Sequence, residues 1–508
     1  MTATLWLSWQ DKVSLSAGDG QAVVAGPASR FAMRSVAPEI VAAMRRLSPP
    51  GEEEQRLAES VLAAGSVHSL ARWFYHLDQL RRRGLIRRSL HADGRLMATL
   101  VPLCRSPGSA AGAAAFVRGR EGRRRTWDRG AGRGARPSGT SYRLSRFAYL
   151  RREGREMVVE SPLAHARVLL HDPRAAVVIA ALGAPATAEQ LAEQAAPCAP
   201  DSISSLVALL LEAGMVHPLP TDDASDPNQP ADSEPADSEP ADLASWEFHD
   251  LLFHARSRRG RSDGQFGGTF RLAHRPPPPA LKTTCDREKY ELHVPDLERL
   301  KRDDPPLALV QERRRSVRRY AAPPITAEQL GEFLYRVARV TGHRRSEMST
   351  PSGPVSMDFM DRPYPAGGGL YELEFYLAVS ACRSLPPGLY HYDPVRHGLD
   401  RVCELTGDVE GLLAEAALSA GIGAETLQVL VVLAARFQRI AWKYESIAYA
   451  LILKHVGVVY QTMYLAATAM GLAPCALGCG DSDLFARAAG TDYYAETSVG
   501  EFLLGSGE

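Results

Sequence analysis

Residues 442–485 read WKYESIAYALILKHVGVVYQTMYLAATAMGLAPCALGCGDSDLF and contain the most apolar helix-length stretch of the chain, at 447–472. This stretch includes Lys454, His455 and Gln461, whereas a membrane-spanning helix needs about 20 residues that are predominantly apolar. The pattern therefore predicts a long helix that is buried in a protein core and does not cross a membrane.

Three polar residues follow one side of this helix, which we expect to cover residues 442–470. Lys454, Gln461 and Thr468 recur every seven residues, so they lie on one stripe of an otherwise apolar helix. Polar groups on a buried helix need hydrogen-bonding partners. Two interpretations stay open: the partners belong to a second subunit or a ligand, or the stripe is satisfied within the core.

The surrounding sequence mixes helices and strands without a regular order. A second helix is expected at 326–340, where Thr326 followed by Gln329 forms a capping box. No G-x-G-x-x-G motif opens a helix after a strand, so the pattern is not that of a doubly wound nucleotide-binding fold. The C-terminal part is thus predicted to be an α+β domain. Its strands are expected at 373–379, 389–392, 428–434 and 498–504.

A basic segment precedes the capping box. Residues 313–320 read RRRSVRRY. Arginine guanidiniums match phosphate oxygens in pairs and a serine adds a hydroxyl donor, so this composition suits a phosphate group. A run of this kind is more often a solvated basic surface, and only its context distinguishes the two.

The context is a glycine loop that leads into a strand. Residues 364–374 read YPAGGGLYELE, with Gly367, Gly368 and Gly369 between Pro365 and the strand. Glycines let the backbone approach a flat ligand closely, because they carry no Cβ. On their own, the three glycines are equally consistent with a flexible loop.

The N-terminal part contains one structural theme twice. In each copy an amphipathic helix ends at a glycine suited to the left-handed conformation, Gly84 in the first and Gly214 in the second. Several helices followed by a short strand give the order of a winged helix, which could bind DNA, a peptide or nothing. The expected helices are 38–47, 52–64, 69–83, 175–182 and 187–195, with a hairpin at 146–161.

Three segments separate the predicted domains. The Arg/Gly-rich loop at 111–140 is consistent with a solvated insertion or with a contact to an acidic peptide. Residues 221–244 contain PADSEPADSEPAD, which cannot bury enough apolar surface to fold. Residues 245–282 are expected to form a docking helix and a rigid Pro-rich crossing. The docking helix is expected to present Trp246, His249 and Phe253 on one face. The remaining boundaries are 1–110 and 141–220 for two winged-helix-like domains and 283–508 for the C-terminal domain.

The composition is typical of a globular protein in a reducing, cytoplasmic compartment. Lys+Arg and Asp+Glu both total 59, so no net charge points to nucleic acid. Seven scattered cysteines, an odd number, argue against a disulfide framework. Cys475 and Cys479 lack a second pair or a histidine cluster, so we expect no metal. Residues 1–10 have no basic region and no apolar run, so we expect no secretory signal.

In combination and order, these segments resemble the SagB-type branch of the nitroreductase-like superfamily over residues 283–508. The resemblance implies a nitroreductase-like fold, bound FMN and the dehydrogenation of azoline rings in peptides. The N-terminal parts are similar to peptide-recognition winged helices of azoline-modifying systems. The matching segments are RRRSVRRY at 313–320, YPAGGGLYELEFY at 364–376, GLYHYDP at 388–394, the stretch at 442–485 and ETSVGEFLLG at 496–505.

The resemblance assigns cofactor-binding roles to individual residues. Arg314, Ser316 and Arg318 match the positions that hold the FMN phosphate. Many relatives have Ser where this chain has Ala366, so backbone amides would replace one hydroxyl contact. Members of the superfamily build the flavin site between two subunits, which suits Gln461 on the polar stripe and implies a homodimer. The residues matched to the lining of the isoalloxazine are Pro365, Ala366, Gly367, Gly368, Leu477 and Gly478.

The resemblance also implies a catalytic pair. Lys443 and Tyr444 match the Lys-Tyr pair that handles protons in the azoline oxidases, and we expect them at the start of the long helix. Oxidation of a thiazoline or oxazoline to the azole removes a proton from one ring carbon and a hydride from its neighbour, and the flavin receives the hydride. Tyr444 is favoured as the base with Lys443 as its electrostatic partner, and the reverse assignment stays open.

Three other functions stay open at this point. The first is an NAD(P)H-dependent nitroreductase or flavin reductase on the same fold, and the second is a dehydrogenase that acts on a carrier-bound intermediate. The third is a winged-helix regulator with a flavin sensor domain. For the favoured function the partners are an azoline-containing peptide, a cyclodehydratase that forms the azoline, and oxygen, which reoxidises the flavin.

Overall fold

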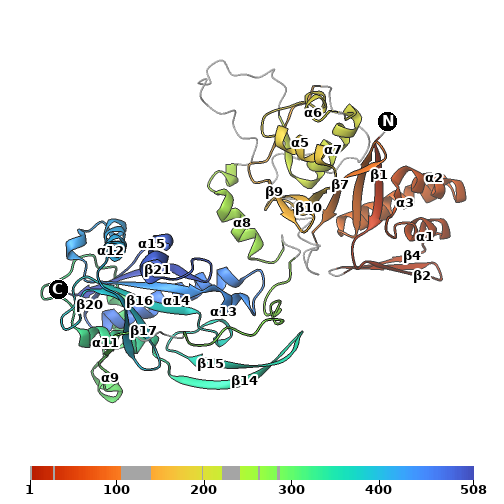
Figure 1. Cartoon of the computed structure of the whole chain (residues 1–508). Helices are drawn as coiled ribbons and strands as arrows, with labels where there is room; N and C mark the ends of the chain where they lie inside the picture. The colour runs from red at the N-terminus through yellow and green to blue at the C-terminus, as the bar shows by residue number, and fades with distance from the viewer. Residues whose placement is uncertain are drawn as a thin grey trace. The chain divides into compact units, whose positions relative to one another are not determined.

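The computed structural model describes residues 3–26, 29–103, 139–196, 198–219, 241–260, 264–282 and 287–507. These residues form two compact units, Met1–Asp263 and Gly264–Glu508, which Figure 1 shows in red to green and in green to blue. Nearly all of the Arg/Gly-rich loop expected at 111–140 and most of the acidic segment at 221–244 lie outside the described residues. Cys104 and Cys285 also lie outside them.

The first unit is built on one antiparallel sheet of seven strands, in the order β5-β1-β6-β7-β11-β10-β9. β7 of the first winged-helix-like segment pairs with β11 of the second, with Leu100 opposite Val168. The two predicted segments therefore share a continuous sheet. Its strands are β5 (Glu52–Glu53), β1 (Thr4–Trp9), β6 (Ile86–Ala92), β7 (Arg95–Pro102), β11 (Ala166–Leu170), β10 (Glu156–Glu160) and β9 (Tyr149–Glu153). Smaller sheets are β2 (Ser14–Gly18) with β3 (Gln21–Ala25) and β4 (Arg30–Arg34), and β8 (Tyr142–Leu144) with β12 (Val216–Pro218).

Two groups of three helices accompany this sheet, as the sequence predicts (Figure 1). Gly84 and Gly214 have φ angles of 65° and 73°, the left-handed conformation that their positions after a helix require. Each group encloses its own apolar core. The helices are α1 (Pro38–Arg45), α2 (Glu54–Ala64) and α3 (Val67–Arg82), then α5 (Pro173–Ala181), α6 (Ala188–Gln194) and α7 (Pro200–Ala213).

The docking helix differs from the prediction. Helix α8 (Phe248–Arg256) begins after Trp246, and His249 is 74% exposed. The buried residues of α8 are Leu251 and Ala255, four positions apart. Leu251 and Ala255 therefore form the buried face of α8. Trp246 is not part of this face, because it precedes the first residue of the helix. Helix α8 lies in the first unit, where Arg256 pairs with the buried Glu160 at 3.6 Å, after the short η1 (Ala241–Leu243).

The second unit contains a seven-stranded antiparallel sheet, in the order β13-β18-β17-β16-β19-β21-β20. Every residue of β16 is buried, because apolar clusters cover both faces of the sheet. Phe375 and Leu377 face one cluster, and Tyr376 and Ala378 face the other. The strands are β13 (Lys289–Glu291), β18 (Gly398–Cys403), β17 (Gly388–Asp393), β16 (Leu373–Val379), β19 (Val429–Arg436), β21 (Glu496–Ser506) and β20 (Leu472–Ala476).

Helices cover both faces, so the predicted α+β class is confirmed. The four predicted strands correspond to β16, β17, β19 and β21, and the capping box of Thr326 and Gln329 is present. A ribbon of β14 (Gly342–Thr350) and β15 (Gly353–Asp361), which the sequence did not indicate, projects from this unit (Figure 1). The helices are α9 (Leu297–Asp303), α10 (Leu307–Arg313), α11 (Ala327–Ala338), α12 (Gly407–Ala420), α13 (Phe437–Ala441), α14 (Ala448–Ala469) and α15 (Ser482–Ala489), with short 3-10 turns η2 (Gly367–Gly369) and η3 (Ala424–Thr426).

The long helix predicted at 442–470 begins only at Ala448, as α14, and α13 lies before the predicted range. Helix α13 ends at Ala441 and α14 begins at Ala448, and Ser446 between them has a φ of 63°, which no helix accommodates. Lys443 and Tyr444 therefore lie in an irregular segment before α14, where the backbone turns. Among the helices that the structure describes, none is long and apolar enough to cross a membrane.

The polar stripe on α14 faces outward. Lys454 and Gln461 are exposed, and Thr468 is half-buried. The interpretation that the stripe is satisfied within the core is therefore wrong for Lys454 and Gln461. The other interpretation, a second subunit or a ligand, stays a prediction.

Candidate active site

The glycine loop connects β15 to β16 and is hydrogen-bonded to a side chain of α14. The backbone N–H of Gly367 donates a hydrogen bond of 2.7 Å to Nε2 of His455. Gly368 and Gly369 have φ angles of 64° and 67°, which only glycine adopts without strain. Two of the three consecutive glycines are therefore required by the backbone path itself.

His455 is in turn held by Glu372, the residue that precedes β16. Its Nδ1 lies 2.6 Å from Oε1 of Glu372, and both side chains are buried. Because Nε2 accepts the Gly367 N–H, the proton sits on Nδ1 and is donated to the carboxylate. Sequence reasoning missed this pair. The signal for it was a histidine within an apolar helix and a glutamate between the glycine loop and a buried strand.

The predicted catalytic pair reaches the same loop. A Cβ placed on Gly368 would lie 2.7 Å from Nζ of Lys443 and 2.7 Å from the hydroxyl of Tyr444. The structure thus brings Lys443, Tyr444 and Gly368 together, although the pair is about 75 residues from the loop in sequence. Burial lowers the pKa of Lys443 and raises the pKa of Tyr444. Both shifts favour the uncharged side chain.

Arg439 fixes the end of the loop. This buried side chain donates hydrogen bonds to three carbonyl oxygens: that of Leu370 at 2.8 Å, that of Pro278 at 2.6 Å and that of Asp358 at 3.1 Å. Burial lowers the pKa of Arg439 to about 10. A guanidinium can satisfy three acceptors in one plane, so Arg439 joins the loop, β15 and the Pro-rich crossing. Sequence reasoning missed Arg439, because no motif or periodicity marks it.

The predicted phosphate-binding residues lie at the other end of α14. The Ser316 hydroxyl is 2.7 Å from that of Tyr464, and the Arg314 guanidinium lies 5.1 Å from the Tyr464 ring centroid. Tyr464 also accepts the N–H of Ala476, at the end of β20. Arg318 is exposed. The segment therefore offers a hydroxyl and guanidiniums at the surface.

Leu477 and Gly478 lie just after β20. The Leu477 side chain is buried in the apolar cluster beneath α12 and α15, and its N–H donates to the carbonyl of Glu501. Gly478 is exposed, with no atom within 4 Å of a Cβ placed on it. The Leu477 side chain is thus part of the core, so any ligand contact here would come from the backbone or from Gly478.

One helix connects the two halves of the candidate site. His455 at the glycine loop and Tyr464 at the basic segment are nine residues apart on α14, which corresponds to roughly 13 Å along the helix axis. Gln461 lies between them in sequence and is exposed. The arrangement suits an elongated ligand with a flat end and an anionic end.

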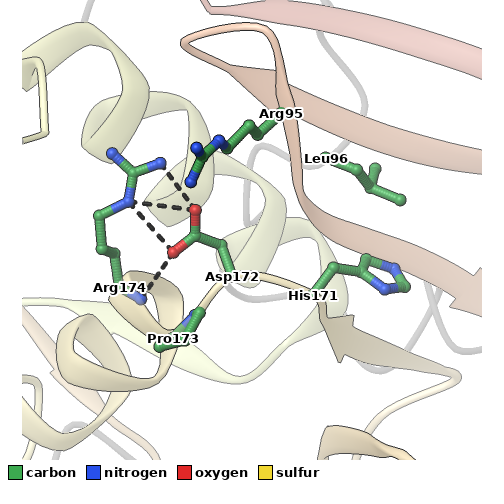
Figure 2. A pocket seen from close by; sticks show the side chains of 6 residues that line it. All are labelled: Arg95, Leu96, His171, Asp172, Pro173 and Arg174. Carbon is green, nitrogen blue, oxygen red and sulfur yellow. Dashed lines mark hydrogen bonds and ion pairs between the residues drawn. The ribbon is translucent and has the colours of Figure 1, made fainter.

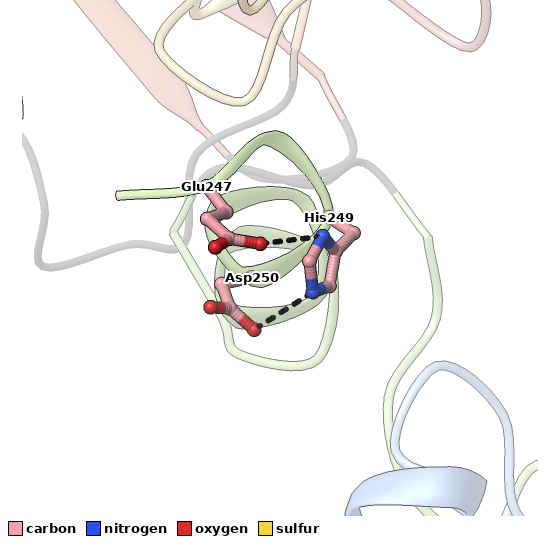
Figure 3. A group of neighbouring side chains, drawn as sticks. All are labelled: Glu247, His249 and Asp250. Atoms are coloured by element: carbon pink, nitrogen blue, oxygen red, sulfur yellow. Dashed lines mark ion pairs between the residues drawn. The ribbon is translucent and has the colours of Figure 1, made fainter. Parts of the chain in front are cut away.

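Two other polar groups in the first unit carry less chemical information. A shallow pocket of about 500 Å³ is lined by residues 95–96 and 171–174. Figure 2 shows the Arg95 and Arg174 guanidiniums near the Asp172 carboxylate, and Arg174 pairs with Asp172 at 2.7 Å. In Figure 3, Glu247 and Asp250 flank His249. All three are exposed neighbours on one helical turn, so we assign no metal to them.

Three parts of the chain match models of known protein families. Residues 312–505 match the nitroreductase family, 142–263 match the cyanobactin oxidase ThcOx, and 1–107 match the ThcOx helix-turn-helix domain. A protein of Methanocaldococcus jannaschii that is named a nitroreductase is 30% identical over 191 residues, which is 38% of this chain and 85% of that protein.

Solved structures are similar at lower identity. A protein named a nitroreductase from Ralstonia eutropha is 20% identical, with 46% of this chain and 94% of that chain covered and a TM-score of 0.33. The Escherichia coli microcin synthetase McbBCD complex with truncated pro-MccB17 is 19% identical, with 51% and 90% covered and a TM-score of 0.32. At these TM-scores the matches support no statement about function.

The chain belongs to the nitroreductase family, because the archaeal relative is 30% identical over most of its length. It is therefore an oxidoreductase by class. The ThcOx-type segments that precede this domain agree with the resemblance to the SagB-type branch seen in the sequence.

Proposed function

We propose that the chain is an FMN-dependent dehydrogenase that oxidises thiazoline or oxazoline rings of a peptide to the aromatic azoles. One observation carries the proposal: Nζ of Lys443 and the hydroxyl of Tyr444 converge on the position of Gly368, where the loop has no side chain. A proton acceptor beside a flat ligand site is what a dehydrogenase needs and what a simple electron-transfer flavoprotein does not need.

The residues present fit FMN. Arg314, Ser316 and Arg318 combine guanidiniums with a hydroxyl, the donor set that a phosphate monoester prefers. The glycine loop offers backbone without Cβ atoms to a flat ring. The N–H of Gly367 is bonded to His455 and that of Gly369 to the Ala366 carbonyl, so these two amides hold the loop's shape. When bound, FMN supplies the acceptor for the hydride that leaves the azoline ring.

The local environment favours Lys443 as the base. Burial pushes Lys443 toward the neutral amine, which can accept the proton from the ring carbon. Burial pushes Tyr444 toward the neutral phenol, which can donate a hydrogen bond but is a poor proton acceptor. We therefore reverse the assignment that the sequence favoured. The ring loses one proton and one hydride, and the two electrons finally reduce oxygen to hydrogen peroxide.

Other parts of the chain suit the binding of a peptide substrate and of a second subunit. The ThcOx-type segments of the first unit are suited to a peptide, and we place the chain after a cyclodehydratase that forms the azoline, in the cytoplasm. The outer face of α14 exposes Leu453, Lys454 and Gln461, and we propose that it forms the interface of a homodimer. Neither nucleic acid nor a membrane is required.

The purified protein tests this function directly. We expect an absorption spectrum of bound flavin, release of a compound with the mass of FMN, and conversion of an azoline peptide to a product that has lost two hydrogen atoms per ring. Oxygen consumption should accompany the reaction without NAD(P)H. A colourless protein that does not bind added FMN would contradict the proposal.

The nitroreductase activity in the archaeal relative's name motivates one alternative. A reductase would consume NADPH rapidly with a quinone or a nitroarene and would leave an azoline peptide unchanged. A dehydrogenase for carrier-bound intermediates would oxidise only azolines linked to a carrier protein. A regulator would retain DNA and show neither turnover.

A further inference from the structure

A segment at the start of the second unit runs along the residues of the catalytic pair. We call residues 264–282 the strap. Gly267 and Glu445 exchange both backbone hydrogen bonds, at 3.3 and 3.0 Å, as paired strands do. The N–H of Phe270 donates to the carbonyl of Lys443 at 3.0 Å. The irregular backbone between α13 and α14 is thus held by a second segment of chain.

Side chains add to these backbone bonds. The Thr269 hydroxyl donates to the Glu445 carboxylate at 2.8 Å, and the Ser446 hydroxyl donates to the carbonyl of Gln265 at 2.8 Å. Nε1 of Trp442 donates to the carbonyl of Arg275 at 2.9 Å. The residues of this segment that bond to the strap are Trp442, Lys443, Glu445 and Ser446.

The far end of the strap is fastened to the sheet. Arg436 donates to the carbonyl of Pro279 at 2.8 Å, in the same region where Arg439 bonds to Pro278. Nζ of Lys282 lies 2.7 Å from both carboxylate oxygens of Glu496 on β21. The strap is therefore fixed at both ends, and its middle cannot shift without moving the residues on which it rests.

Phe270 is the strap residue that faces the catalytic lysine. Nζ of Lys443 lies 5.6 Å from the centroid of the Phe270 ring, so the apolar ring covers one side of the amine. The same ring packs edge-on against Trp442 at 5.6 Å. A Cβ placed on Gly268 would lie 3.5 Å from Cε of Lys443, so the strap also covers the lysine stem.

Phe270 has a backbone conformation that is unusual for an aromatic residue. Its φ is 53°, a conformation that is unfavourable for a bulky residue and natural for glycine. Tyr371 and Ser446, which border the same site, also have positive φ angles of 46° and 63°. Strained residues of this kind are known to cluster at functional sites. If position 270 served only to form the turn, glycine would fit this φ angle with less strain than phenylalanine.

We propose that Phe270 is a positioning residue for Lys443: its ring shields the Lys443 side chain from water and holds Nζ over Gly368. This inference rests on the proposed function for its catalytic meaning, because it assumes that Lys443 is the base. Removal of the ring should let water reach the amine, and the amine should then bind its proton at higher pH. A higher pKa leaves a smaller fraction of the amine unprotonated at neutral pH. While the pKa lies above the working pH, each rise of one pH unit in the pKa lowers the rate about tenfold.

The first experiment measures the amine itself and needs no substrate. The full-length protein is acetylated with acetic anhydride at a series of pH values, and Lys443 is followed by peptide mass spectrometry. The chain has six lysines, and the exposed Lys12 serves as an internal reference. In the wild type we expect the midpoint of labelling to lie lower for Lys443 than for Lys12. In Phe270→Leu the two midpoints should approach each other.

Two further variants separate shielding from loosening of the fold. Phe270→Gly removes the ring and relieves the strained backbone, so its melting temperature should stay near that of the wild type while the Lys443 midpoint rises. Phe437→Leu is the matched control, because Phe437 is a half-buried aromatic that packs against the same core cluster. We expect Phe437→Leu to leave the midpoint unchanged. The inference would be overturned if Phe270→Leu and Phe437→Leu shifted the Lys443 labelling midpoint equally. It would also be overturned if neither Phe270 variant shifted that midpoint.

The second experiment measures azoline oxidation as a function of pH. The acidic limb of kcat should move to higher pH in Phe270→Leu, with bound flavin unchanged. If the wild type oxidises azolines and the limb does not move, the role of Phe270 is wrong and the proposed function stands. If the wild type oxidises no azoline, the proposed function fails, and the labelling experiment still decides whether Phe270 shields Lys443.

Discussion

Gly367 donates its backbone N–H to Nε2 of His455 at 2.7 Å, across 88 positions of the sequence. The bond joins the middle of the glycine loop to a helix that also carries Tyr464, whose hydroxyl contacts Ser316 of the basic segment. Because Glu372 holds the opposite nitrogen of the imidazole, the loop, the helix and the first residue before β16 are a single connected unit.

Removal of His455 should loosen the loop. In His455→Ala the half-buried Gly367 N–H loses its acceptor, which costs about 1 kcal/mol of stability, and FMN should bind more weakly. Glu372→Gln is the milder comparison, since its amide oxygen can still accept the Nδ1 proton. The measurements are thermal unfolding and fluorescence titration with FMN. An alanine variant that binds FMN as tightly as the wild type would show that the bond does not shape the flavin site.

A methyl group on Gly368 should abolish turnover. The Cβ of Gly368→Ala would lie 2.7 Å from Nζ of Lys443 and the Tyr444 hydroxyl, and the residue has a φ of 64°. We expect a loss of azoline oxidation of about 100-fold or more, the range typical of a displaced acid–base group. Gly407→Ala is the matched control, because nothing lies within 4 Å of its Cβ. Similar losses in both variants would contradict a local effect.

Substitutions of Lys443 and Tyr444 should affect kcat to different extents, and the pH dependence of kcat should report on the base. Lys443→Gln should lower kcat by about 10²–10⁴-fold with flavin still bound, because it removes the proton acceptor. Tyr444→Phe should retain more activity. In the wild type, kcat should rise with pH and level off below the ordinary lysine pKa, because burial lowers the pKa of Lys443. Greater loss in Tyr444→Phe than in Lys443→Gln would return the role of base to Tyr444.

The basic segment should control affinity and leave the chemistry unchanged. Arg318→Ala removes one charge-assisted contact to a phosphate, which corresponds to about a 10- to 100-fold weaker affinity for FMN. At saturating FMN, kcat should be close to that of the wild type. Arg319→Ala is the matched control, because Arg319 is an exposed neighbour with the same charge. Equal weakening in both variants would indicate a general electrostatic effect in place of a phosphate site.

Glu374 should make stability depend on pH at the acid end. Burial alone would raise the pKa of Glu374, but the bond from His391 and the Arg436 guanidinium lower it from 4.5 to about 2. The carboxylate thus contributes stability above pH 4.5, roughly 3 kcal/mol for a shift of this size, and the contribution is lost as pH falls toward 2. Unfolding of Glu374→Gln between pH 7 and 2 should show a smaller pH dependence. Parallel curves for the two proteins would refute the assignment.

The sequence by itself determined the local elements of the second unit. The apolar runs of β16 and β19 gave the central strands, the Thr326–Gln329 spacing gave the start of α11, and the order of the motifs gave the family. These features depend on neighbours within a few positions, so periodicity and capping rules are sufficient to find them. The same reasoning placed the left-handed glycines after the helices of the first unit.

The tertiary structure alone decided how those elements meet. Periodicity extended the long helix through residues 442–447, because an apolar pattern does not show where a second segment of chain competes for the backbone. At that point Gly267 and Phe270 take the hydrogen bonds of Glu445 and Lys443, and the helix is interrupted. The partner of His455, the three acceptors of Arg439 and the contact of Phe270 with Lys443 are also set by distant residues. Hydrogen bonds and burial depend on distance in space, and a one-dimensional pattern holds that information only for residues close along the chain.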